Sequence, residues 1–184
     1  MFKDPTSDFI TLLNIWNAWE KEAAAKGGKK ASVLKQFCKT HYLSFLRMRE
    51  WQDIHAQLTD ILAEQGLGRE KQSPEPDRDN RRSPFKPLYR AIHQSLLSGY
   101  LSGIAVKKEK NIYTAARSRE AMIFPGSGLF NNGGAWIMAA EMGETSRLYA
   151  RTTANIDPLW LVELGGDLLV KQYNTPRWDR KKGA

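Results

Sequence analysis

A glycine-rich stretch between two apolar runs is the part of this sequence closest in composition to a catalytic or phosphate-binding loop. It reads AMIFPGSGLFNNGGAW and covers residues 121–136. A phosphate-binding P-loop needs a lysine and a hydroxyl residue directly after its last glycine, and neither Gly128 nor Gly134 is followed by them. A nucleophile elbow needs glycines two residues either side of its serine, whereas Ser127 has glycines as its immediate neighbours. The stretch therefore predicts a connection between two strands, made by glycines that adopt positive φ.

Histidine and cysteine side chains are too few and too scattered to predict a metal or nucleophile site. His41, His55 and His93 are far apart, and Cys38 is the single cysteine. A zinc site is usually built on at least one closely spaced pair of ligands. One cysteine also excludes an intrachain disulfide. We expect no catalytic residue, no metal and no cofactor in this chain.

Binding chemistry is better represented, because the chain is basic. It has 28 lysines and arginines against 20 acidic residues, a net charge of +8 that favours an anionic partner such as nucleic acid. Cationic side chains gather in the last half of the sequence: Lys107, Lys108, Lys110, Arg117, Arg119, Arg147 and Arg151.

Aromatic residues interleave with these cations: Tyr113, Phe124, Phe130, Trp136 and Tyr149. In an extended strand Arg147, Tyr149 and Arg151 would share one face, which places two cations around a ring. Single-stranded nucleic acids are bound by such basic grooves with aromatic stacking platforms. The alternative is that the aromatics form a core beneath a merely charged surface, and the pattern leaves both open.

Helices are predicted to dominate the first third of the chain. Apolar residues recur at helical spacing over residues 5–26, after capping residues at 6–8. A second helical pattern covers residues 32–65, which is too long for one straight helix in a small domain, so we expect a break between Lys39 and Arg47. Residues 1–65 are thus predicted to form a helical unit. Residues 66–87, rich in proline and charge, are predicted to be a flexible linker or loop.

Five short strands are predicted after a helix that begins at Leu88. They lie in the segments YLSGIAVKK, NIYTAAR, AMIFPG, AWIMAAEM and RLYARTTANI, joined by hairpin-sized connections. A closing helix is predicted from Asp157, its cap, and Pro158, in its first turn. The predicted fold class is α+β: the helical unit, then a helix plus a five-stranded OB-fold-like barrel with a C-terminal helix over residues 88–172, and a polar tail over 173–184. No leader or membrane span is evident, so we expect a cytoplasmic protein that does not enter a membrane.

Several motifs resemble the C-terminal accessory region of DEAH-box RNA helicases, most closely the bacterial HrpA type. They are SDFITLLNIWNAW, FCKTHYLSFLRMREWQDIHAQL, AIHQSLLSGYLSGIA, IFPGSGLF, RLYARTTANIDPLWLVEL and TPRWDR. The resemblance implies the end of a helical ratchet domain followed by an OB fold that lies over an RNA channel. ATP and Mg would be bound by the two RecA-like domains of the parent helicase, and this fragment would not hydrolyse ATP itself.

The resemblance also implies residue roles. Ser127 aligns with a family serine, whereas Phe124 stands where the family has a histidine, and Arg151 and Thr153 fall on a strand beside the RNA path. Together with the basic and aromatic pattern, this gives the expected RNA-binding residues: Lys107, Lys108, Lys110, Arg117, Arg119, Ser127, Arg147, Tyr149, Arg151 and Thr153.

Two functions remain from the sequence. The first is a module that guides single-stranded RNA beside the RecA-like motor of the same parent chain. The second is a protein-interaction platform that docks a partner, such as the ribosome, or the helicase core through the OB fold.

Overall fold

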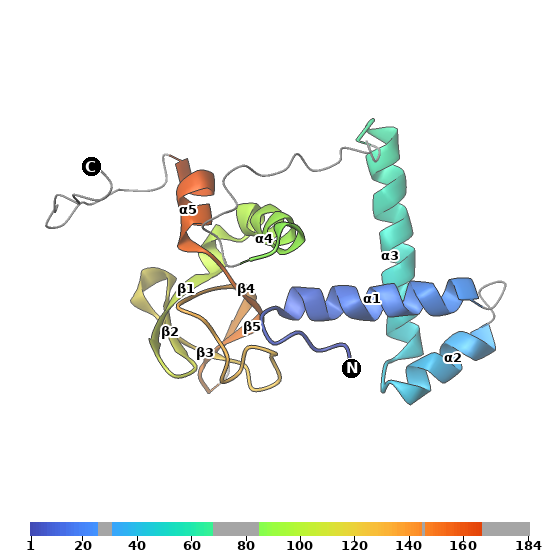
Figure 1. Ribbon diagram of the computed structural model, residues 1–184, viewed down its shortest axis with the longest axis horizontal. Coiled ribbons are helices and arrows are strands. Elements are labelled where there is room, and N and C mark those ends of the chain that lie inside the picture. Colours follow the sequence, from blue (N-terminus) through green and yellow to red (C-terminus); the bar gives the residue numbers. More distant parts are fainter. Residues whose placement is uncertain (26–30, 68–84, 145, 167–184) are drawn as a thin grey trace, which may run out of the picture. The chain divides into compact units, whose positions relative to one another are not determined.

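The computed structural model describes residues 1–25, 31–67, 85–144 and 146–166, which form two compact units (Figure 1). Met1–Pro84 make the first unit and Phe85–Ala184 the second. Most of the predicted linker and the whole predicted tail at 173–184 lie outside the described residues.

The first unit contains three helices: α1 (Asp8–Ala25), α2 (Ala31–Thr40) and α3 (Phe45–Glu64). The Ser7 Oγ accepts a hydrogen bond from the Ile10 N–H (3.1 Å) and so satisfies one of the free donors at the start of α1. Ser44 caps α3 in the same way, by accepting from the Arg47 N–H at 3.4 Å. The predicted break between Lys39 and Arg47 is confirmed, because the chain leaves α2 through Tyr42 at φ 56° before Ser44 starts the next helix.

Large side chains from all three helices form the core of this unit. Trp19 and Leu34 are fully buried and pack with Cys38 and Met48, which are also buried. Burial raises the pKa of the Cys38 thiol above its usual value. The side chain of Cys38 therefore behaves as a small apolar core residue.

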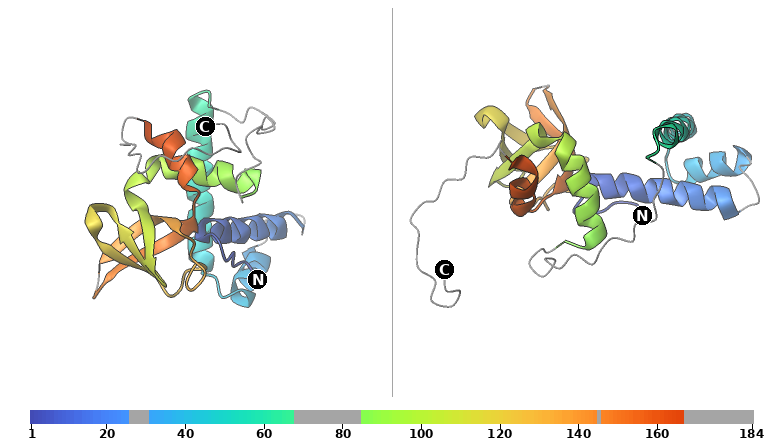
Figure 2. Two further views of the ribbon diagram at one scale, coloured as in Figure 1. Left: turned by 60° about the vertical axis from the view of Figure 1, so that its left-hand side comes forward. Right: turned by 90° about the horizontal axis from the view of Figure 1, so that it is seen from above.

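The second unit is built on five strands that close into a barrel (Figures 1 and 2). Their bounds are β1 (Ile104–Glu109), β2 (Ile112–Ala115), β3 (Glu120–Ile123), β4 (Trp136–Glu144) and β5 (Leu148–Asn155). Around the barrel the order is β1-β2-β3-β5-β4, and β4 pairs again with β1. All five predicted strands are confirmed, and inward residues such as Tyr113, Ile123 and Ile137 fill the interior.

The prediction that hairpin-sized connections join the five strands is wrong for β3 and β4, which are separated by residues 124–135. β3 pairs in parallel with β5, with Met122 opposite Tyr149, so the 124–135 loop joins two strands that are not adjacent in the barrel. A parallel pair needs a longer connection than a hairpin provides, and here β4 supplies it.

The glycines of the same loop do not adopt positive φ, contrary to the prediction; Asn131 does, at φ 70°. At position 133, glycine is required because the backbone packs closely against core side chains. A Cβ on Gly133 would lie 2.3 Å from the Tyr113 Oη and 2.7 Å from the Ile123 Cδ1. The loop is therefore pressed against the barrel interior.

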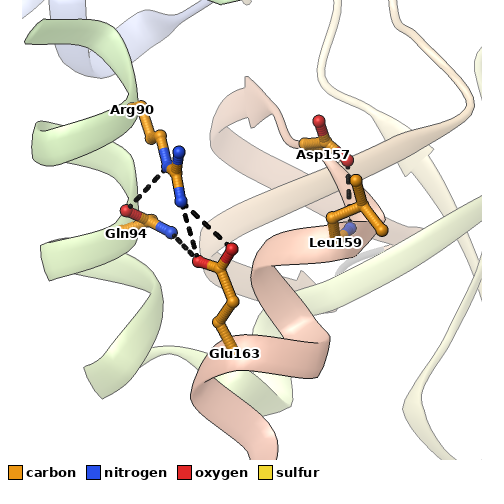
Figure 3. Close-up of polar contacts among 5 residues, drawn as sticks. All are labelled: Arg90, Gln94, Asp157, Leu159 and Glu163. Atoms are coloured by element: carbon orange, nitrogen blue, oxygen red, sulfur yellow. Dashed lines mark hydrogen bonds and ion pairs between the residues drawn. The ribbon is translucent and has the colours of Figure 1, made fainter. Parts of the chain in front are cut away.

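Two helices, α4 (Pro87–Gly99) and α5 (Pro158–Gly165), lie next to each other beside the barrel (Figure 2). Figure 3 shows Arg90 and Gln94 of α4 reaching Glu163 of α5: the Arg90 Nη2 donates to both carboxylate oxygens at 3.0 Å, and the Gln94 Nε2 donates at 2.6 Å. Asp157 caps α5 as predicted, by accepting from the Leu159 N–H at 3.0 Å. The two helices are thus tied to each other, and the Tyr89 hydroxyl of α4 donates to the Asn155 carbonyl at the end of β5 at 2.9 Å.

Candidate nucleic-acid interface

An outward-facing row of side chains crosses three neighbouring strands of the barrel. Ile112 of β2 is paired with Met122 of β3, and Met122 is paired with Tyr149 of β5. Because side chains alternate along a strand and Ala121 and Tyr113 point inward, these three residues point out of the barrel. All three are half-buried, so the row is an apolar strip that keeps contact with solvent.

Two arginines lie on β5 or just before it, on either side of Tyr149. We call the surface made by these side chains the β2–β3–β5 face; its residues are Ile112, Met122, Phe124, Arg147, Tyr149 and Arg151. The prediction that Arg147, Tyr149 and Arg151 share one face fits this arrangement. The three are alternate residues: Arg147 directly precedes β5, and Tyr149 and Arg151 lie in its first half.

Arg151 and the two rings form a contact cluster within this face. The Arg151 Cζ lies 4.1 Å from the centroid of the Phe124 ring, and the Phe124 and Tyr149 rings meet edge to face with centroids 5.9 Å apart. A guanidinium over a ring is attracted by the negative face of the π-system. Arg151 makes no ion pair within the described part of the chain, although Glu141 is its cross-strand partner.

A groove runs along the other end of the face. It is lined by Ile112, Glu120, Ala121, Met122, Arg147 and Leu148. These residues come from β2, β3 and the start of β5, with Arg147 in the β4–β5 connection. OB folds bind oligonucleotides with the surface of strands 2 and 3 and with the loops between strands 1 and 2 and strands 4 and 5.

Ser127 and Thr153, two of the expected RNA-binding residues, lie inside the barrel unit. They are 5% and 0% exposed, and their hydroxyl oxygens are hydrogen-bonded at 2.9 Å. The Ser127 Oγ also accepts from the Leu129 N–H at 3.1 Å. The expectation of direct RNA contact is therefore corrected: these hydroxyls are enclosed by protein and satisfied within it.

The backbone of Thr152 explains why Thr153 turns inward. Strict alternation would place Thr153 on the same face as Arg151, but Thr152 has φ 49°, a conformation that β-branched residues rarely adopt. The alternation is broken at this residue. The outward row therefore ends at Arg151 and Thr153 enters the interior.

The remaining expected cations differ in how far they are already engaged. The Lys107 Nζ donates to the Gly133 carbonyl at 2.7 Å, Lys108 pairs with Glu120, and the Arg119 Nη2 lies 2.5 Å from a Glu144 oxygen. The Glu120 carboxylate raises the pKa of Lys108 through a hydrogen bond and charge attraction. Lys110 and Arg117 are exposed, and neither makes an ion pair with any described residue.

The aromatic residues divide between the two readings that the sequence left open. Tyr113 belongs to the core: it is fully buried, its hydroxyl donates to the Gly134 carbonyl at 2.8 Å, and burial raises its pKa to about 12. Phe130 packs against the same core. Phe124 and Tyr149 face outward, and Trp136 is half-buried.

Ile112 and Met122 were not predicted as part of the site. Both are aliphatic, whereas the site was predicted from cations and aromatic rings. The signal that could have found them is the alternation of β3, in which buried Ala121 and Ile123 force Met122 outward.

The described residues contain no group of three or more histidine, cysteine, aspartate or glutamate side chains that is placed to hold a metal ion. None of the described helices is long and apolar enough to cross a membrane.

The strand order and the face together define an oligonucleotide/oligosaccharide-binding fold. Residues 92–168 match the family with the description "Oligonucleotide/oligosaccharide-binding (OB)-fold", which confirms the predicted barrel type. This domain belongs to a chain that resembles HrpA-type ATP-dependent RNA helicases over its full length, as the sequence motifs indicated.

The relatives are much longer than this chain. The ATP-dependent RNA helicase HrpA of Escherichia coli (strain K12) is 39% identical over 184 residues, which cover 100% of this chain and 13% of that protein. The HrpA homolog of Haemophilus influenzae is 37% identical over 187 residues, again 100% of this chain and 13% of the relative. The pre-mRNA-splicing factor ATP-dependent RNA helicase prp22 of Schizosaccharomyces pombe is 26% identical over 168 residues, 89% of this chain and 12% of that protein.

Proposed function

We propose that this chain is the nucleic-acid-binding accessory module of an ATP-dependent RNA helicase, which guides single-stranded RNA beside a RecA-like motor. The observation that carries the proposal is the β2–β3–β5 face, where Arg147 and Arg151 border a half-buried row of apolar and aromatic side chains. Its position matches the surface that OB folds use for oligonucleotides. The similarity to proteins named as RNA helicases supports RNA as the ligand.

The face suits a single strand with little sequence preference. Stacking of a base on an aromatic ring is worth about 1–3 kcal/mol and tolerates every base. The arginines would contact phosphates, which position the strand without reading it. The proposed contacts are therefore stacking on Phe124 and Tyr149 between two phosphate contacts from Arg147 and Arg151.

In this proposal, ATP hydrolysis belongs to the parent protein. Its RecA-like domains would bind ATP and Mg and would be partners of this chain, with the ribosome as a further partner and the cytoplasm as the location. The isolated chain would have no ATPase activity. A phosphate-release assay with and without RNA tests this, and ATP turnover that copurifies with the chain and survives further purification would contradict it.

The direct test is a titration of a fluorescent single-stranded RNA at several salt concentrations. We expect weak binding at about 50 mM salt that is reduced in R147A/R151A. A single strand releases about 0.7 counterion for each neutralised phosphate, so two lost contacts make the slope of log affinity against log salt shallower by about 1.4.

The control variant is R47A/R49A, which removes the same charge from exposed positions on α3. Its slope should equal that of the unmodified chain. Absence of RNA binding at low salt, or equal slopes for both double variants, would refute direct RNA contact by the face.

The second candidate is a protein-interaction platform, which the apolar character of Ile112 and Met122 favours because neither can contact a phosphate. Purified RecA-like domains of a helicase relative can be tested for binding to the nuclease-treated chain. Binding that is lost in I112E/M122E and unaffected by R147A/R151A would favour this candidate.

A further inference from the structure

Two cations beside the β2–β3–β5 face are held by carboxylates of the same chain. Lys108 of β1 pairs with Glu120 of β3, and Arg119, directly before β3, pairs with Glu144 at the end of β4. Each of the four side chains keeps at least half of its surface exposed. Both pairs are therefore open to competition from solvent ions and from a ligand.

Arg147 and Arg151 differ from these two cations. Neither forms an ion pair with any described residue, and Arg151 rests on a ring instead. The surface thus contains two cations that can meet a phosphate at once and two that must first leave a carboxylate. Glu120 also lines the groove next to Arg147, so its charge lies where a phosphate would approach.

We infer that Glu120 and Glu144 act as intramolecular competitors of RNA phosphates, which mask Lys108 and Arg119 and keep the grip on the strand weak. This inference rests on the proposed function. Exposed ion pairs are worth only about 0–1 kcal/mol, so carboxylates and phosphates compete for these two cations on nearly equal terms, and each cation stays on its carboxylate for part of the time. A strand that moves past the module would then keep its phosphate contacts with Arg147 and Arg151, whereas its contacts with Lys108 and Arg119 would form and break.

Masking has a signature that a general change of net charge does not. A masked cation that becomes available adds a phosphate contact, and each contact on a single strand adds about 0.7 to the slope of log affinity against log salt. The double variant E120Q/E144Q should therefore steepen the slope by up to about 1.4. Between 50 and 200 mM salt, its affinity should fall by up to about 7-fold more than that of the unmodified chain.

The experiment measures binding of a fluorescent single-stranded RNA to the full chain, E120Q/E144Q and the control E163Q. Glu163 is matched because it also pairs with an arginine in the same unit, but through α4 and α5 (Figure 3). The control should keep the original slope. Thermal unfolding of each variant shows that the fold is retained.

The outcomes separate the inference from the proposed function. If the unmodified chain and the double variant both bind RNA and their salt slopes are equal, masking is overturned and RNA binding by the chain still stands. Binding by the double variant alone would support masking and contradict RNA binding by the unmodified chain. E163Q removes one carboxylate and the double variant removes two. A slope that steepens in E163Q by half as much as in the double variant would overturn masking, because net charge would then explain the effect.

Discussion

Arg151 rests on the Phe124 ring although a carboxylate, Glu141, stands opposite on β4. A guanidinium is planar and weakly hydrated, so it stacks on a ring and keeps edge donors for another acceptor. The same ring is also held edge to face by Tyr149. This contact fixes the position of Arg151 without neutralising its charge, which is what a phosphate contact requires.

Phe124→Ala tests the contribution of stacking at the scale of one residue. We expect RNA affinity to fall roughly 5- to 160-fold, because one stacked base is worth about 1–3 kcal/mol. The salt slope should stay the same, since a phenyl ring contacts no phosphate. Fluorescence titrations at several salt concentrations measure both quantities.

Phe124→Trp is the matched variant, because it keeps a platform for Arg151 and for a base. It should bind within a few-fold of the unmodified chain. Equal affinity of the alanine variant and the unmodified chain would show that Phe124 only supports the barrel surface.

At the scale of elements, the helix boundaries followed from the sequence because their signals are local. Ser44 accepts from the Arg47 N–H, and this one hydrogen bond starts α3 after the predicted break. The strands were also predictable from short apolar and aromatic runs between turns. Neither signal contains the order of strands in space, so the parallel pairing of β3 with β5 was not predicted.

The candidate site was predictable only as far as side-chain alternation continued without interruption. Arg147, Tyr149 and Arg151 obey it, whereas Thr152 at φ 49° reverses the side on which Thr153 lies. Nothing in the residue type announces this, because threonine is among the residues least suited to positive φ. Tertiary packing imposes the conformation.

The stability of the barrel unit is predicted to depend on the hydrogen bond between Ser127 of the 124–135 loop and Thr153 of β5. Ser127→Ala removes the hydrogen bond to Thr153 and the acceptor of the Leu129 N–H. Loss of a buried hydrogen bond typically costs about 1–3 kcal/mol, so the free energy of unfolding in urea should fall by that amount. RNA affinity at a temperature where the variant is folded should not change.

Ser98→Ala provides the comparison, because the Ser98 hydroxyl is exposed on α4 and donates only to the Ser95 carbonyl. It should leave unfolding nearly unchanged. A Ser127→Ala chain of full stability with weakened RNA binding would return Ser127 to the binding surface.

At the scale of the whole molecule, the chain spans 13% of the length of its HrpA relatives. Its first unit has an apolar helix face that the described residues of that unit do not cover. Ile54, Leu58, Ile61 and Leu62 recur at helical spacing on α3 and are each 48–56% exposed. The contacts of α3 with α1 lie nearer its start, where Trp16 meets Trp51 and His55 with ring centroids 5.3 and 4.8 Å apart. Within the first unit, the rest of α3 therefore keeps this apolar face exposed.

The isolated chain should therefore associate with itself as its concentration rises, since a contiguous exposed apolar surface is seldom left in contact with water. L58E/I61E places two charges in the middle of this stripe and should lower the apparent mass measured by light scattering, with helicity unchanged by circular dichroism. A56E/A63E adds the same charge to exposed positions on the opposite side of α3, where it should have little effect. If both double variants lower the mass equally, charge repulsion explains the change and the stripe is not the contact; if the unmodified chain stays monomeric at high concentration, the exposed face does not drive association.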